Sequence, residues 1–169
     1  ISTVDKLKQM EKLLTLIIPT YNMEKLLDRC LSSLVAKDNS LFQQVEVLVV
    51  IDGSKDRSSE IAHRYQDRYP AVFRVIDKDN GNYGSCVNRG LKEATGKYIK
   101  VLDADDYFNT EAFTQYLATI KNQDADLIIT SGTNVTEQNE PMLKWRFDYE
   151  PNRMYPIEDL KRVWIHEVT

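Results

Sequence analysis

Three carboxylates lie within four positions of this sequence, in the segment "VLDADD" at residues 101–106. Asp103, Asp105 and Asp106 directly follow an apolar run, 98–102, that is typical of a buried β-strand. Like charges this close repel one another, and apolar surroundings increase that cost. A bound cation would offset the repulsion, and ligands made only of oxygen favour Mn²⁺ or Mg²⁺ over zinc. The sequence therefore predicts a divalent-metal site after this strand.

A metal of this kind also predicts a phosphorylated ligand. Mg²⁺ and Mn²⁺ usually take one or two protein carboxylates and complete their coordination with water and substrate phosphates. The two histidines, His63 and His166, are far apart in the sequence and offer no cluster for zinc. A metal that bridges two phosphates could also stabilise a departing diphosphate by acting as a Lewis acid.

The elements that must position these acids follow from the pattern of apolar runs. Continuous apolar runs alternate with segments of helical spacing, and Asn22 is expected to cap the first helix. This alternation predicts an α/β fold, a Rossmann-like open and mostly parallel sheet flanked by helices. The expected strands are 13–19, 45–51, 71–77 and 97–102. The expected helices are 22–35, a second one that Asp56, Ser58 and Glu60 open and that runs to about Tyr69, and 85–95.

Polar residues follow several of these strands at their carboxyl ends, where open parallel sheets bind ligands. Pro19, Thr20 and Tyr21 end the first strand, Asp52 ends the second, and the acidic segment ends the fourth. We expect these residues to share one cleft. The alternative is that Asp52 and the acids serve only as turn residues, since Asp favours turns.

The remainder of the chain is less regular. Residues 109–123 are expected to form a capped helix, 125–137 one or two strands, and 156–168 a further helix. Residues 1–12 are expected to be a lead-in segment, and 13–169 a single domain.

Composition excludes some classes of protein. The chain has 169 residues, 42% of them hydrophobic and 28% charged, which fits a globular domain. A net charge of −4 argues against a nucleic-acid partner, and no apolar run has the length of a transmembrane segment. Cys30 and Cys86 lie in apolar helical contexts and are expected to be buried thiols of a reducing compartment.

Three segments, in this order and spacing, resemble family 2 glycosyltransferases, a family of inverting, nucleotide-sugar-dependent enzymes with a GT-A fold. They are "IIPTYN" (17–22), "VVIDGSKDRS" (49–58) and "NGNYGSCVNRGLKEATGKYIKVLDADD" (80–106). The similarity covers about residues 13–110, the nucleotide-binding half of such enzymes. The last segment looks especially like bacterial members that build cell-surface glycans.

The resemblance implies roles for individual residues. Asp103-Ala104-Asp105 matches the D-x-D motif, which makes Asp105 the main metal ligand and Asp103 a contact to the ribose or the metal shell. Asp106 matches a frequent third acid of the metal site. The remaining matches are nucleotide contacts: Pro19, Thr20 and Tyr21 around the nucleoside, Asp52 at the base (commonly uracil), and Gly84 and Asn88 against the nucleotide.

The resemblance also implies the activity. A metal-dependent, hexosyltransferase-type enzyme would transfer a sugar from a nucleoside-diphosphate sugar, most often UDP-linked, to a glycan or lipid-linked acceptor, in cell-surface polysaccharide or cell-wall synthesis. The full protein is then expected in the cytoplasm or peripherally at the inner face of the membrane. No segment matches the family's catalytic base, so the base is expected outside this chain, which would be a truncated, donor-binding part.

Three alternatives remain at this point. The chain could bind nucleotide without turnover. A dinucleotide-dependent oxidoreductase is disfavoured because "PTYN", and no G-x-G-x-x-G, follows the first strand. A receiver-like signalling domain would gather its acids after the first and third strands, whereas here they follow the second and fourth.

Overall fold

The computed structural model describes residues 12–36, 39–136, 138, 140–147, 149–150, 153–156 and 165–168. The chain divides into two compact units, with the boundary between Asn122 and Gln123. The expected lead-in segment lies outside the described residues except for Lys12, which begins the first strand. Every residue that the sequence predicts to contact nucleotide or metal belongs to the first unit.

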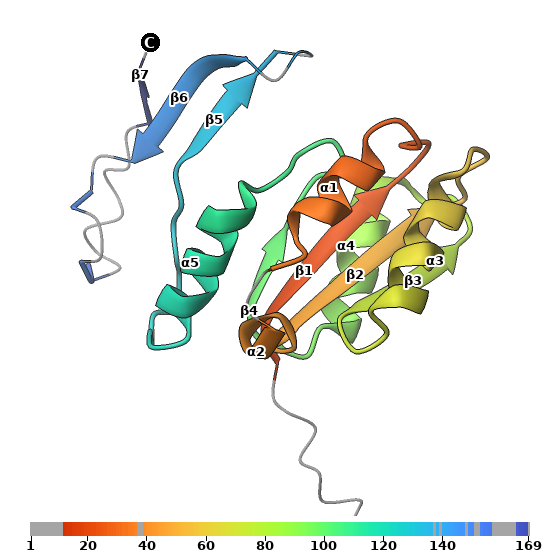
Figure 1. The fold of residues 1–169 in the computed structure, drawn as a ribbon, viewed down its shortest axis with the longest axis horizontal. Coiled ribbons are helices and arrows are strands. Elements are labelled where there is room, and N and C mark those ends of the chain that lie inside the picture. The colour runs from red at the N-terminus through yellow and green to blue at the C-terminus, as the bar shows by residue number, and fades with distance from the viewer. Residues whose placement is uncertain are drawn as a thin grey trace, which may run out of the picture. The chain divides into compact units, whose positions relative to one another are not determined.

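The first unit is built on a four-stranded parallel sheet, as the sequence predicts (Figure 1). Its strands stand in the order β3-β2-β1-β4, so the chain adds two strands on one side of β1 and then returns to its other side. The strand bounds are Lys12–Thr20 for β1, Val45–Asp52 for β2, Phe73–Lys78 for β3 and Gly96–Val101 for β4.

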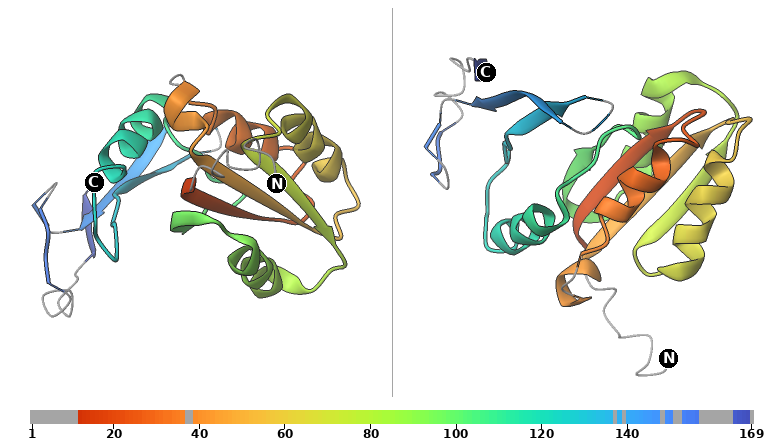
Figure 2. Two further views of the ribbon diagram at one scale, coloured as in Figure 1. Left: turned by 90° about the horizontal axis from the view of Figure 1, so that it is seen from below. Right: turned by 45° about the horizontal axis from the view of Figure 1, so that its top comes forward.

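Helices cover both faces of this sheet, which explains why its central strands are uniformly apolar. Helices α1 (Leu27–Ser33) and α3 (Ser58–Arg68) lie on one face and α4 (Asn82–Glu93) on the other (Figure 2). All residues of β2 are buried, whereas the edge strand β4 alternates between half-buried and exposed positions. The core beneath α4 consists of Ile17, Leu48, Val50, Ile76 and Cys86.

Some boundaries differ from those predicted. Helix α1 begins at Leu27, and Asn22 does not cap it, since Asn22 has a left-handed backbone with φ 53° and its side chain bonds elsewhere. Helix α4 begins at Asn82, so Gly84 lies within its first turn instead of in a loop. A short helix α2 (Asn39–Phe42) interrupts an expected loop. The capped helix is confirmed as α5 (Thr110–Ile120), whose Asn109 side chain accepts from the N–H of Ala112.

The second unit contains a three-stranded antiparallel sheet in the order β5-β6-β7. Its strands are Gly132–Val135, Pro141–Phe147 and Ile165–Val168. The strand prediction for 125–137 is therefore right only for its later part. The helix prediction for 156–168 is wrong at 165–168, which form β7, while 157–164 lie outside the described residues. Within the described residues, no helix combines the length and the apolar character needed to cross a bilayer.

Candidate functional site

The strand order places a switch point between β1 and β4 at the carboxyl edge of the sheet. Pairing of β1 with β2 continues to Thr20, whereas pairing with β4 ends at Ile17 opposite Val101. One more hydrogen bond, from the N–H of Leu102 to the carbonyl of Ile17 at 2.9 Å, closes that ladder. Beyond this bond β1 continues to Thr20 beside β2 without pairing with β4, at the edge of the sheet where open α/β folds bind ligands.

The acidic segment forms a tight turn at this point. The N–H of Asp106 donates to the carbonyl of Asp103 at 3.0 Å, and the Ala104 side chain is buried beneath the turn. Asp103, Asp105 and Asp106 are all exposed. The structure therefore brings the three predicted acids to one surface, with their backbone anchored and their carboxylates toward solvent.

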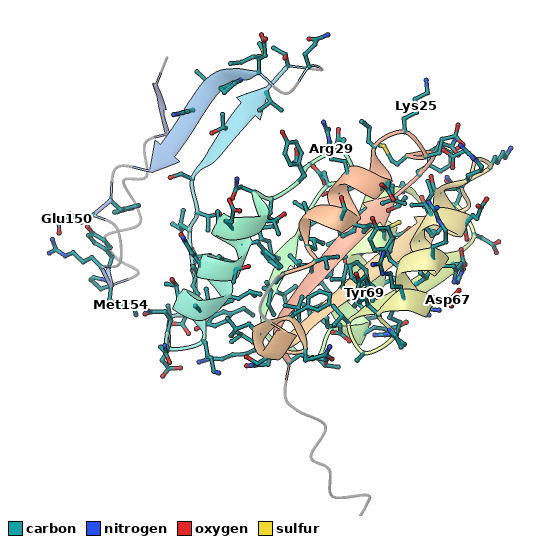
Figure 3. All side chains as sticks on the ribbon, viewed as in Figure 1. Lys25, Arg29, Asp67, Tyr69, Glu150 and Met154 are labelled. Carbon is teal, nitrogen blue, oxygen red and sulfur yellow. The ribbon has the colours of Figure 1, made fainter. Side chains whose placement is uncertain are left out.

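Helix α1 holds the backbone of this turn from its side. The Arg29 guanidinium donates to the carbonyl of Asp105 at 3.1 Å and lies over the Tyr107 ring, 4.5 Å from its centroid. The Cys30 thiol donates to the carbonyl of Asp103 at 3.8 Å. Arg29 projects from α1 in Figure 3. Sequence reasoning missed Arg29, because its partners lie more than 70 residues further along the chain.

The carboxylates of the acidic turn repel one another, which disfavours their charged forms. Burial raises the pKa of Asp106, and the neighbouring charges of Asp105 and Asp103 raise it further, with Arg29 and Lys100 offsetting part of the effect. Burial, followed by the same acids, raises the pKa of the Cys30 thiol to about 12, so this thiol stays protonated and serves as a donor. A positive ion at the turn would relieve the repulsion among the acids.

The first turn of α4 reaches the acidic turn through one side chain. The Tyr83 hydroxyl donates to Oδ1 of Asp103 at 2.7 Å, and this bond is the main reason that the pKa of Tyr83 rises to about 12. Gly84 and Asn88, which are four residues apart and so share a helix face, are both exposed. The sequence did not single out Tyr83 as a site residue.

Asp52 has a different environment from the acidic turn. It is 3% exposed, and its Oδ1 accepts from the Lys78 ammonium and from the N–H of Gly81 at 2.9 Å. Burial alone would raise the pKa of Asp52, but these hydrogen bonds and the charge of Lys78 bring it below its usual value. The Asn80 side chain also donates to the Asp52 carbonyl, so Asp52 fixes the connection between β3 and α4.

The connections that follow β1 and β2 are joined by a set of hydrogen bonds that we call the loop interlock. Asn22 donates its N–H to Oγ of Ser54 at 3.1 Å and accepts from the N–H of Lys55 at 2.9 Å. The interlock continues with Met23 N–H to Ser58 Oγ, Glu24 N–H to Asp56 Oδ2, and Arg57 N–H to Glu24 Oε2. These hydrogen bonds fix the two loops against each other.

The loop interlock fixes the end of β1, where three nucleotide contacts are predicted. Pro19 is buried within the strand, and Thr20 is buried with its hydroxyl donating to the carbonyl of Ile18. Tyr21 is 46% exposed, and in the chain it lies between Thr20, the last residue of β1, and Asn22, the first residue of the loop interlock. Its ring is therefore available to a ligand at the carboxyl edge of the sheet.

The residues at the turn suit a metal that is shared with a ligand. Among the residues that the structure describes, no group of three or more His, Cys, Asp or Glu side chains is arranged to enclose an ion. The exposed, mutually repelling carboxylates instead fit a cation held by one or two of them, with phosphate and water as its other ligands.

Comparison with known sequences identifies the protein family that this chain matches. The model of the family described as "Glycosyl transferase family 2" matches residues 15–165. An uncharacterized glycosyltransferase of Bacillus subtilis, EpsJ, is 36% identical over 119 residues, which are 70% of this chain and 33% of EpsJ. The poly(ribitol-phosphate) β-N-acetylglucosaminyltransferase TarS of Staphylococcus aureus is 31% identical over 127 residues, 75% of this chain and 22% of TarS. The chain spans about a third of the length of the curated relatives it matches.

Solved structures agree with the fold. A TarS fragment crystallised with UDP has a TM-score of 0.55 and 29% identity, covering 64% of this chain and 32% of that one. The mannosyltransferase PcManGT of Pyrobaculum calidifontis, at 22% identity and a TM-score of 0.56, covers 67% and 33% and supports the fold alone. The oxidoreductase and receiver-like alternatives are thereby wrong. By its family match, its relatives and its parallel sheet, this chain belongs to glycosyl transferase family 2 and has the GT-A fold.

Proposed function

We propose that this chain forms the donor-binding part of an inverting glycosyltransferase that uses a nucleoside-diphosphate sugar, with UDP as the nucleotide. The observation that carries the proposal is the convergence of Tyr21 and the acidic turn at the switch point between β1 and β4. A TarS fragment whose structure matches this chain at 31% sequence identity was crystallised with UDP-GlcNAc, which supports the choice of a UDP-sugar.

In this proposal the nucleoside lies against Tyr21 at the end of β1, within reach of the loop fixed by Asp52. The exposed face of α4, with Gly84 and Asn88, lies along the diphosphate. Asp105 would hold Mn²⁺ or Mg²⁺, with Asp103 at the ribose or metal shell and Asp106 as a further acid. The metal would supply the positive charge that stabilises the departing diphosphate.

The acceptor hydroxyl must lose a proton as it attacks the anomeric carbon, and this requires a positioned base. We assign no residue of this chain to that role. The proposed acceptor is a glycan or lipid-linked molecule in bacterial cell-surface polysaccharide or cell-wall synthesis, at the cytoplasm or the inner face of the membrane. The name of TarS, which acts on poly(ribitol-phosphate), supports a cell-surface acceptor. The alternative, donor binding without transfer, predicts nucleotide affinity but no released UDP.

Calorimetric titration of UDP, with and without Mn²⁺, tests the donor site. We expect binding that depends on Mn²⁺, and a loss of at least about tenfold in affinity for Asp105→Ala, because charge-assisted contacts of this kind are worth 1.5–3 kcal/mol. The control is Asp67→Ala, an exposed aspartate on α3 that Figure 3 shows away from α1. If Asp105→Ala binds UDP with Mn²⁺ as tightly as the parent, the metal assignment is wrong. If the parent binds no UDP, the proposed donor is wrong.

A further inference from the structure

Tyr83 and Asp103 come from the two segments that flank β4 in the chain, and a hydrogen bond joins their side chains. Tyr83 lies in the first turn of α4, and Asp103 follows β4. The hydroxyl donates to Oδ1 of Asp103 at 2.7 Å, although the Tyr83 residue is 55% exposed. An exposed tyrosine held in this geometry gives up side-chain freedom, so the bond must contribute enough to offset that cost.

The helix that carries Tyr83 is fixed to the sheet. Gly90, which lies on the same helix seven residues after Tyr83, is buried against Ile17. The loop before α4 is held by the Asp52 carboxylate, which accepts from the N–H of Gly81. The preceding Asn82 has φ 72° and its side chain accepts from the N–H of Ser85, which stabilises the first turn. Tyr83 is therefore an anchored donor, and Asp103 is the group that it orients.

Resting on the proposed function, we propose that Tyr83 is a positioning residue for donor binding, acting through the Asp103 carboxylate. A carboxylate accepts about four hydrogen bonds in all, so the bond from Tyr83 fixes its plane and leaves acceptor capacity for ribose hydroxyls or the metal shell. Preorganising an acceptor reduces the ordering cost that binding must otherwise meet. Tyr83 thus raises donor affinity without itself touching the reacting atoms.

The test compares two tyrosine-to-phenylalanine variants of the chain by titration of UDP in the presence of Mn²⁺. Tyr83→Phe removes only the hydroxyl, and we expect about tenfold weaker binding, the lower range for a hydrogen bond to a charged group. The matched control is Tyr65→Phe on α3, whose hydroxyl also donates to an aspartate, Oδ1 of Asp28 at 3.1 Å, and not to a residue of the acidic turn. This control should bind UDP as the parent does.

A double-mutant cycle separates positioning from a general structural role. Asp103→Ala should weaken binding by itself and removes the acceptor of the Tyr83 hydroxyl, so Tyr83→Phe should then add little in that background. Unfolding of the ligand-free variants by urea should show no loss in Tyr83→Phe beyond that in Tyr65→Phe.

Two results would overturn the inference while leaving the proposed function in place. One is a Tyr83→Phe variant that binds UDP with Mn²⁺ as tightly as the parent. The other is an effect of Tyr83→Phe that is equally large in the Asp103→Ala background. A parent chain that binds no UDP would overturn the proposed function, and this inference with it.

Discussion

The N–H of Met23, just after β1, donates a hydrogen bond of 2.8 Å to Oγ of Ser58, which is fully buried at the start of α3. This bond belongs to the loop interlock, and it connects the loop that follows β1 to the start of α3. We expect Ser58→Ala to lower the free energy of unfolding by about 1–2 kcal/mol, because the Met23 N–H loses its partner. Urea denaturation measures the change.

The neighbouring serine provides the control for this prediction. Ser59 is part-exposed, and its hydroxyl donates to Asp77 at the surface. Ser59→Ala should change the free energy of unfolding by less than about 0.5 kcal/mol. Equal losses in the two variants would mean that the loop interlock contributes no special stability.

The buried pair of Asp52 and Lys78 should make stability depend on pH. The folded-state pKa of Asp52 is below its usual value, so the pair stabilises the fold above about pH 4 and that contribution is lost as the pH falls through the folded pKa. Lys78→Met should therefore cost about 2–3 kcal/mol at pH 7 and less at pH 3, measured by urea denaturation. Lys25→Met, at a lysine that extends into solvent in Figure 3, should cost little at either pH.

Alanine substitutions at two glycines of α4 should change the free energy of unfolding in opposite directions. A Cβ at Gly90 would lie less than 3.0 Å from three carbon atoms of the buried Ile17 side chain, so Gly90→Ala should destabilise the fold by about 1–3 kcal/mol. At Gly84 the added carbon would meet only the Asn82 side chain, at 3.5 Å. Gly84→Ala should stabilise the ligand-free chain by up to about 1 kcal/mol through helix propensity.

Gly84→Ala should at the same time weaken UDP binding if the nucleotide lies on the exposed face of α4 as proposed. Thermal unfolding with and without UDP and Mn²⁺ separates the two effects. A variant that is more stable and also binds UDP as well as the parent would remove Gly84 from the proposed site.

Removing one charge from the acidic turn should leave the stability of the ligand-free chain unchanged or higher but should weaken metal binding. Asp105→Asn removes a charge that repels Asp106, so without a divalent ion the variant should be as stable as the parent or more stable, by no more than about 0.5 kcal/mol because the groups are exposed. With Mn²⁺ and UDP, the parent should gain thermal stability and the variant should not, since only a ligand that binds the folded state raises it. A stability gain that is equal in both would contradict the role given to Asp105.

The parallel sheet could be predicted from the sequence because its central strands are covered on both faces. Burial on two faces requires an unbroken apolar run, and such runs at 13–19 and 45–51 correspond to β1 and β2. Asp52 comes at the end of the second of these runs, and the acids follow the run at 97–102, which corresponds to β4. The three acids are exposed directly after β4.

Features that depend on distant partners could not be predicted in this way. Asn22 has the composition of a helix cap, yet its side chain accepts from Lys55, so local pattern gave the wrong helix start. Tyr83 and Arg29 became recognisable only when the fold brought them to the acidic turn. Residues 125–131 are apolar enough for a strand, but they belong to none in the structure, because a strand needs a partner as well as a pattern.

The strand order β3-β2-β1-β4 also has a consequence for the newly made chain. Lys12 pairs with Gly96, so about 84 further residues must be synthesised after β1 begins before β4, its partner on one side, starts to appear. At roughly 5–20 residues per second, a ribosome takes about 4–17 seconds to supply that partner. During that interval the apolar β1 can pair on one side only, and its unpaired edge makes the growing chain prone to aggregation.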